Sequence, residues 1–196
     1  MSAGSAIPPS HTTVMYEGVA GADQSQTVGP EAYLSKSSAA RRMGAAAEHL
    51  VAASCIIATR GQLNVSTSLV DDEGVDLVFH RRGSTATLAV QVKARFSDGA
   101  AYQERKFMAN LRAATFGPRE DLDLLFVAID IERGAVECAW LVPSVDFDAR
   151  KGSLRTLGTF RFTASMKPGS ADQWRPWRLT PAELPWAVIE RLGGIT

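Results

Sequence analysis

The stretch that decides the fold is GVDLVFHRRGSTATLAVQVK, residues 74–93, in which two strand-like runs flank a polar turn. Residues 75–80 are mostly apolar, residues 81–84 carry an Arg-Arg-Gly-Ser turn, and residues 85–93 resume an apolar run with several β-branched side chains. We therefore predict two neighbouring strands that are joined as a hairpin.

Three polar side chains interrupt this apolar hairpin. Asp76 lies in the first run, and Gln91 and Lys93 end the second run, two residues apart and therefore on one face of a strand. In a hairpin the same face can present Asp76, about 5 Å from its cross-strand neighbour. Taken alone, such a pattern more often indicates an ion pair between Asp76 and Lys93. A third polar group is therefore needed to indicate a functional site.

The segment before the hairpin offers that third group. Residues 37–60 are rich in Ala, and spacings of three and four between apolar positions predict a helix. Glu48 borders its apolar stripe, where a carboxylate costs several kcal/mol unless it is paired or bound to a cation. The alternative is a solvated Glu48 that bonds to a neighbouring Arg41, Arg42 or His49. The expected stripe consists of Met43, Ala47, Leu50, Ser54 and Ile57.

The rest of the chain extends an α/β pattern. Residues 63–70 are expected to form a strand, residues 122–131 read as a strand covered on both faces, and residues 137–142 predict a further strand. A second helix is predicted before the apolar run from three residues at helical spacing, Phe107, Leu111 and Ala114. The order of elements predicts a mixed sheet flanked by helices.

A C-terminal helix is well signalled. Thr180 fits its N-cap, Pro181 its first residue, and Glu183 completes a capping box. Its apolar stripe consists of Leu184, Val188 and Leu192.

Length and composition predict one soluble domain. The 196 residues are 45% hydrophobic with a formal net charge of zero, so only local charge can indicate a nucleic-acid partner. We expect a flexible arm at 1–36, a core at 37–143, and an extension at 144–196 packed on the core. We expect neither a secretory signal nor a membrane-spanning run, and Cys55 and Cys138 are expected to be buried thiols. The expected location is therefore the cytoplasm.

The order of these motifs resembles the PD-(D/E)xK nuclease superfamily. A helical Gly44-Ala-Ala-Ala-Glu48 is followed by Gly74-Val-Asp76 on one strand and Gln91-Val-Lys93 on the next. The match is closest to the restriction-endonuclease-like and Holliday-junction-resolvase-like branch, whose members often carry Gln-x-Lys. The resemblance covers residues 38–143. It implies an αβββαβ core, here followed by a C-terminal extension that ends in a helix.

The resemblance also implies an activity, which is Mg²⁺- or Mn²⁺-dependent hydrolysis of phosphodiester bonds in DNA, in repair, restriction or defence. Asp76 and Gln91 would bind the ion together with the backbone carbonyl of Val92. Glu48 would bind through water or hold a second ion. Lys93 would orient the attacking water. Gln91 replaces a carboxylate, which removes one negative charge from the site.

Local charge suggests where nucleic acid would bind. Basic residues cluster just after the motif, and the predicted contacts are Arg95, Arg105, Lys106 and Arg112. Dispersed, solvated charge is the alternative. RNA in place of DNA, and a homodimer or a partner protein, stay open. A second hypothesis is an inactive nuclease-fold module that binds nucleic acid or assembles with protein, and a third is an immunity- or antitoxin-like partner.

Overall fold

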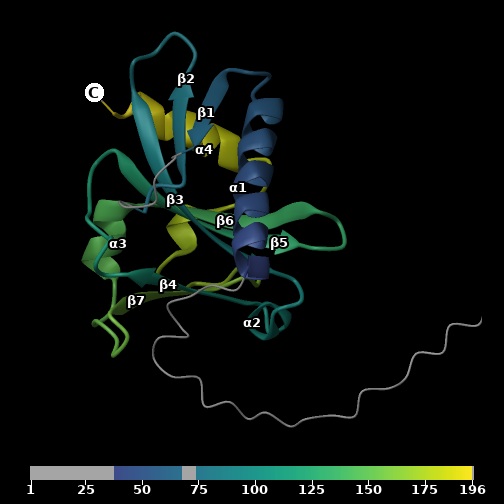
Figure 1. The fold of residues 1–196 in the computed structure, drawn as a ribbon, viewed down its shortest axis with the longest axis vertical. Helices are drawn as coiled ribbons and strands as arrows, with labels where there is room; N and C mark the ends of the chain where they lie inside the picture. Colours follow the sequence, from purple (N-terminus) through teal and green to yellow (C-terminus); the bar gives the residue numbers. More distant parts are fainter. Residues whose placement is uncertain (1–37, 68–73, 196) are drawn as a thin grey trace, which may run out of the picture. The chain divides into compact units, whose positions relative to one another are not determined.

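A six-stranded mixed sheet forms the centre of the computed structural model, which describes residues 38–67 and 74–195 (Figure 1). The strand order is β1-β2-β3-β5-β6-β8, with β3 and β5 parallel and all other neighbours antiparallel. The predicted hairpin is therefore confirmed as β2 and β3. The strands are β1 (Leu63–Thr67), β2 (Leu77–Arg81), β3 (Thr87–Phe96), β5 (Leu122–Asp130), β6 (Ala135–Pro143) and β8 (Arg178–Leu179).

Two helices, α1 (Ser38–Ala58) and α4 (Leu184–Gly193), cover one face of this sheet and share a hydrophobic core with it. The buried side chains of α1 are Ala47, Val51 and Cys55, at spacings of four residues. The predicted stripe was wrong at its ends, because Met43 is 38% and Ile57 is 76% exposed. Ala47 is buried and Leu50 packs against the core as predicted, whereas the other buried positions, Val51 and Cys55, follow the predicted Leu50 and Ser54 by one residue.

A second layer covers the other face and contains a two-stranded antiparallel ribbon. It consists of α2 (Ala100–Gln103), β4 (Lys106–Arg112), α3 (Ser144–Arg150), β7 (Thr159–Ser165) and the 3₁₀ helix η2 (Arg175–Trp177). The second helix predicted from Phe107, Leu111 and Ala114 is wrong, because β4 occupies that segment. Phe107, Ala109 and Leu111 are buried in alternation, and β4 pairs with β7 along its whole length.

Aromatic side chains fill the space between the ribbon and the sheet. Phe126 of β5 stacks on Phe162 of β7, with ring centroids 3.6 Å apart and an angle of 9° between the planes. Trp174 lies 4.9 Å from Phe162 and is buried, so it packs inside the protein. Residues 144–196 therefore contribute side chains to both core clusters.

The remaining predictions on the C-terminal helix and the thiols are confirmed except for the helix start, because α4 begins at Leu184 and Pro181 lies in a turn before it. Thr180 and Glu183 form a reciprocal capping box, in which the Thr180 N–H donates to Glu183 Oε2 at 2.8 Å. The α/β class, with a mixed sheet, flanking helices and a C-terminal helix, is confirmed. Cys55 and Cys138 are buried and free. Among the described residues, no helix is long and apolar enough to cross a membrane. The predicted arm at 1–36 lies outside the described residues.

Candidate functional site

Asp76 lies directly before β2 and is tied to β3 by two hydrogen bonds. Its backbone N–H donates to the Val90 carbonyl at 3.0 Å, and its Oδ2 accepts from the Val92 N–H at 2.6 Å. Leu77 is the register partner of Val90, so Asp76 lies next to Gln91 across the hairpin. The hairpin thus brings the Asp76 carboxylate to the predicted Gln-x-Lys segment.

Gln91 and Lys93 lie on the face of the sheet opposite to α1. Their register partners on the parallel strand β5 are Leu124 and Phe126, which belong to the core of the second layer. Leu77, next to Asp76 in the chain, faces α1, so alternation places the Asp76 side chain on the same side as Gln91. Gln91 is only 9% exposed, and Lys93 is half-buried. The structure therefore places three of the predicted site residues on one face.

The Gln91 amide packs closely against Gly74. A Cβ added to Gly74 would lie 2.4 Å from Gln91 Nε2, and Gly74 has a φ of +69°. No hydrogen bond joins the Gln91 amide to any residue in the described part of the chain. Among the described residues, Trp140 Nε1 is the one fully buried side-chain polar atom without a partner, so the Gln91 amide keeps some contact with solvent. This amide therefore fits the role of a ligand to an ion or to ordered water.

Gly74→Ala is expected to destabilise the protein by about 1–3 kcal/mol, because a left-handed backbone strains an L-residue and the new Cβ displaces Gln91. Gly83→Ala is the matched control. Gly83 has a φ of +79°, and an added Cβ would meet no atom within 4 Å. Urea denaturation of both variants separates backbone strain from the contact with Gln91. Equal losses in the two variants would mean that the contact has no energetic role.

The geometry around Val92 suits a cation with hard oxygen ligands. The N–H and the carbonyl of one strand residue point to the same edge, and the Val92 N–H points to Asp76. The Val92 carbonyl therefore faces the edge where Asp76 and the Gln91 amide lie. The described residues contain no cluster of three His, Cys, Asp or Glu side chains suited to a metal. An ion here would depend on one carboxylate and neutral oxygens, and Mg²⁺ keeps several waters in such sites.

Glu48 is half-buried on α1, directly after the buried Ala47. The helix α1 packs on the sheet face opposite to the one on which Gln91 and Lys93 lie. The participation of Glu48 in the site stays a prediction.

The four basic residues predicted to bind nucleic acid have different surroundings. Arg95 donates through Nε to the Met108 carbonyl at 2.6 Å. The Arg105 guanidinium forms an ion pair with Glu137 at 2.6 Å. Lys106 and Arg112 are exposed at the two ends of β4. Arg95 and Arg105 are thus bound to neighbouring residues, and Lys106 pairs with Glu104 at the surface.

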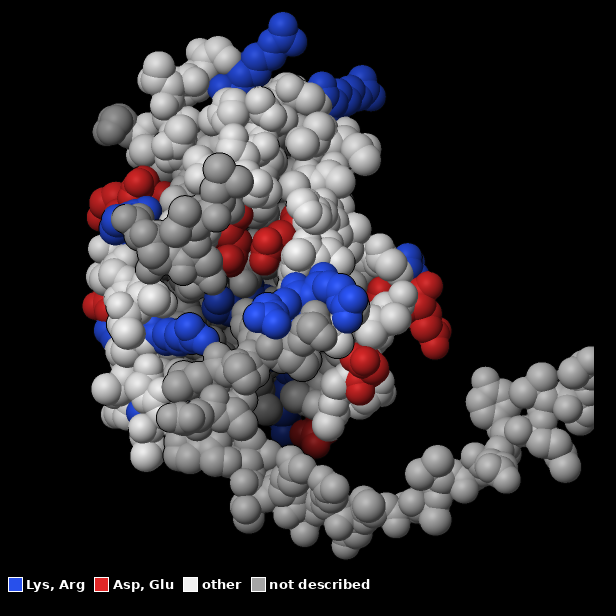
Figure 2. All heavy atoms as spheres, in the orientation of Figure 1, with Lys and Arg blue, Asp and Glu red and all other residues white. Residues whose placement is uncertain are grey.

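Charged side chains gather on the face that α1 borders (Figure 2). Acidic side chains lie near the middle of this face, beside α1, and Lys and Arg side chains lie just below them in the view. The face therefore combines the two kinds of charge that binding a cation and a phosphate requires.

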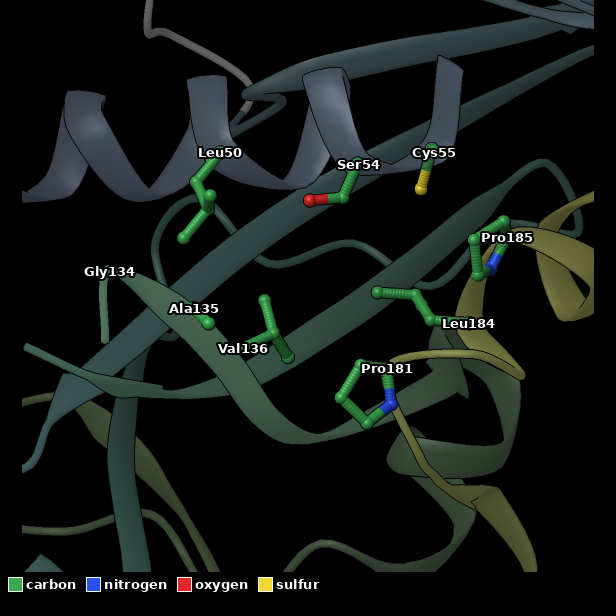
Figure 3. Close-up of a pocket in the computed structure, with 9 residues that line it drawn as sticks. All are labelled: Leu50, Ser54, Cys55, Gly134, Ala135, Val136, Pro181, Leu184 and Pro185. Atoms are coloured by element: carbon green, nitrogen blue, oxygen red, sulfur yellow. The ribbon is translucent and has the colours of Figure 1, made fainter. Parts of the chain in front are cut away.

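An apolar pocket lies away from these residues, between α1, the β5–β6 turn and the start of α4 (Figure 3). It has a volume of about 210 Å³, and Leu50, Cys55 and Leu184 are among the side chains that line it. Burial raises the pKa of the Cys55 thiol to about 12. The thiol therefore stays protonated at neutral pH and is a poor nucleophile.

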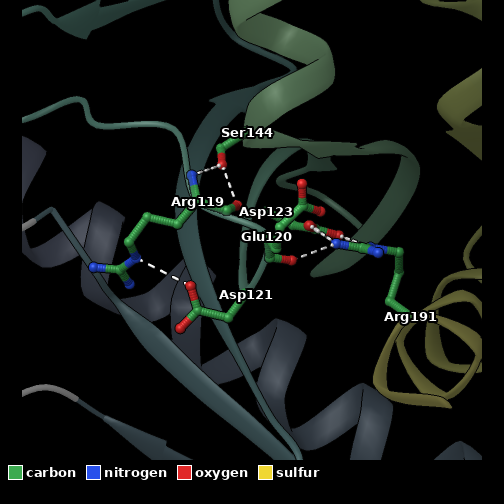
Figure 4. Close-up of polar contacts among 6 residues, drawn as sticks. All are labelled: Arg119, Glu120, Asp121, Asp123, Ser144 and Arg191. Atoms are coloured by element: carbon green, nitrogen blue, oxygen red, sulfur yellow. Dashed lines mark hydrogen bonds and ion pairs between the residues drawn. The ribbon is translucent and has the colours of Figure 1, made fainter. Parts of the chain in front are cut away.

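A buried ion pair that the sequence did not indicate joins α4 to β5 (Figure 4). Arg191 donates from Nε and Nη2 to the two carboxylate oxygens of Asp123, at 2.9 and 2.8 Å. Nη2 also donates to the Glu120 carbonyl at 3.0 Å. Asp123 is fully buried within a strand that reads as continuously apolar. With both oxygens occupied by the guanidinium, the pair holds the C-terminal helix in place.

Comparisons with known proteins place few limits on the site. No protein-family model matches the chain, and no curated protein matches its sequence. Among solved structures, the chain is similar to a bacterial homing endonuclease, I-Ssp6803I, with a TM-score of 0.49 and 19% identity. The match covers 78% of this chain and 94% of that chain. At this level the likeness carries no argument about the present chain.

Proposed function

We propose that the chain is a metal-dependent endonuclease that hydrolyses phosphodiester bonds in DNA. The observation that carries the proposal is the meeting of Asp76, the unpartnered Gln91 amide and Lys93 on one face of the β2–β3 hairpin. A carboxylate, an amide and an amine next to one strand edge are the groups that bind a hard cation and a phosphate.

Each residue has a distinct part in the proposed reaction. The Asp76 carboxylate and the Gln91 amide oxygen bind Mg²⁺ or Mn²⁺, with the Val92 carbonyl on the same edge. The ion, when bound, neutralises the phosphate and lowers the pKa of a bound water. Lys93 orients the attacking water and offsets charge on the phosphate. Glu48 binds through water or holds a second ion.

Removal of the metal is the direct test. The protein is incubated with supercoiled plasmid, linear duplex, a four-way junction, single-stranded DNA and RNA, each with Mg²⁺, Mn²⁺ or EDTA. We expect cleavage of at least one DNA form with either ion, and loss of cleavage in EDTA because the phosphate charge is no longer neutralised. Gel electrophoresis measures the products. Absence of cleavage with both ions, or cleavage of RNA alone, would contradict the proposal.

The inactive nuclease-fold module is the second candidate, and the Gln91 amide favours it because it replaces a carboxylate. Calorimetry with Mn²⁺ separates the two functions. Heat of ion binding that depends on Asp76 favours the nuclease, and DNA binding without such heat favours the module. An immunity- or antitoxin-like protein would instead bind a companion protein and no nucleic acid.

A further inference from the structure

The ribbon of β4 and β7 has one face in the core and one face in solvent. Phe107, Ala109 and Leu111 of β4 point inward, as do Phe162 and Ala164 of β7. The alternating residues form the outer face. We define this outer face by Lys106, Met108, Asn110 and Arg112 of β4 and by Arg161 and Thr163 of β7, all of which are exposed.

The outer face is basic and rich in hydrogen-bonding side chains. Neither strand contains an acidic residue, and Asn110 lies directly opposite Arg161. Lys106 pairs with Glu104 at 2.9 Å, but both side chains are more than half exposed. Such a surface pair contributes about 0–1 kcal/mol, so a phosphate group can replace the carboxylate. In a chain of zero net charge, this concentration of one sign favours an anionic partner.

The ribbon lies beside the candidate site. Arg95 follows Gln91 and Lys93 on the same face of β3, and it bonds the Met108 carbonyl in the middle of β4. Past the C-terminal end of β4, the Thr115 carbonyl oxygen lies 3.7 Å from the point that a Cβ on Gly74 would occupy. The Gln91 amide lies next to the same point. The ribbon packs on β5 and β6, on the same face of the sheet as Gln91 and Lys93 of β3. The outer face of the ribbon therefore points away from the sheet, on the same side as the Gln91 and Lys93 side chains.

We propose that the outer face of the β4–β7 ribbon enters the major groove of double-stranded DNA and holds the duplex beside the candidate site. The major groove, about 12 Å wide, admits a two-stranded β-ribbon. Lys106, Arg112 and Arg161 bind phosphates or base edges, and Asn110 has the amide that pairs with adenine. The position of the scissile bond in this proposal rests on the proposed function, whereas the binding of DNA to the ribbon does not.

Equilibrium binding without cleavage tests the surface. The affinity of the protein for a labelled 25-base-pair duplex is measured by fluorescence anisotropy in EDTA at several salt concentrations. The double variant Lys106→Ala/Arg161→Ala is expected to raise the Kd about tenfold or more and to lower the salt slope by about two, since each lost phosphate contact removes about 0.9. Arg82→Ala/Arg133→Ala removes two exposed cations from other turns and is the charge-matched control.

Base reading is tested with Asn110→Ala. This variant is expected to narrow the difference in affinity among duplexes of different sequence, with an unchanged salt slope. Equal losses in the two double variants would overturn the proposal, as would stronger binding to single-stranded DNA or RNA than to duplex. If the native protein binds duplex through the ribbon but never cleaves, the proposed function fails and the ribbon proposal stands. If it cleaves and the ribbon variant binds as tightly as the native protein, only the ribbon proposal fails.

Discussion

Asp76→Asn is expected to reduce metal-dependent cleavage about a thousandfold or more while it leaves the fold almost unchanged. The variant keeps a side-chain oxygen that can accept from the Val92 N–H, a bond of 2.6 Å in the native protein. It removes the negative charge that holds the ion, and the ion supplies several kcal/mol of transition-state stabilisation, where each 1.4 kcal/mol corresponds to a factor of ten. Initial cleavage rates and urea denaturation measure the two effects separately.

Asp76→Ala extends this test, because it removes the hydrogen bond as well as the charge. An unsatisfied Val92 N–H is expected to cost about 1–3 kcal/mol of stability in addition to the loss of cleavage. Asp98→Asn removes the charge of an exposed carboxylate just after β3 and is the control for nonspecific electrostatics. Cleavage by Asp76→Asn at the native rate would show that Asp76 is only a structural acceptor.

The strands around the candidate site could be predicted because their pattern is local. Residues 74–93 alternate and turn within one hairpin, so the register that pairs Leu77 with Val90 follows from a short connection. The neighbourhood of Asp76 and Gln91 was therefore predictable from spacing. The position of Glu48 was not, because it depends on the rotation of α1 about its axis, and part of the predicted stripe on that helix was displaced by one residue.

The second layer could not be predicted because its pairing is not local. Phe107 and Leu111 are four residues apart, a spacing that fits both a helix and a strand. The small Ala109 between them gave no strong signal, although it is buried. The partner that selects the strand, β7, lies about fifty residues later, in a segment without a clear pattern. The buried Asp123 was missed for the same reason, since Arg191 belongs to the last helix.

Arg191→Met is expected to lower the free energy of unfolding by about 3–5 kcal/mol, because it leaves the buried Asp123 carboxylate without its partner. Met retains much of the apolar stem of Arg, so the variant mainly removes the guanidinium. Arg150→Met is the matched control. Arg150 pairs with Asp146 at 3.1 Å, with both side chains about 40% exposed, and lies 4.8 Å from the centroid of the Trp177 ring, so its loss is expected to cost about 1–2 kcal/mol. Urea denaturation at pH 7 compares the two variants.

The loss in Arg191→Met is also expected to depend on pH. Burial raises the pKa of Asp123 in the native protein, and the hydrogen bonds from Arg191 oppose that rise. Without Arg191, the folded-state pKa rises further above the value in the unfolded chain, about 3.9. The folded variant then binds the proton more tightly than the unfolded chain does. The contribution of Asp123 to stability is therefore fully present below pH 4 and is lost as the pH rises through the folded-state pKa.

A second substitution shows whether the unpaired charge causes this loss. In Arg191→Met/Asp123→Asn no charge remains buried at the start of β5, so the double variant is expected to be more stable at pH 7 than Arg191→Met alone. Its stability is also expected to lose the added pH dependence. If the double variant is as unstable as the single one at every pH, the loss comes from the packing of α4 against the sheet. In that case the hydrogen bonds of Arg191 would matter less than the apolar contacts of Leu184, Val188 and Leu192.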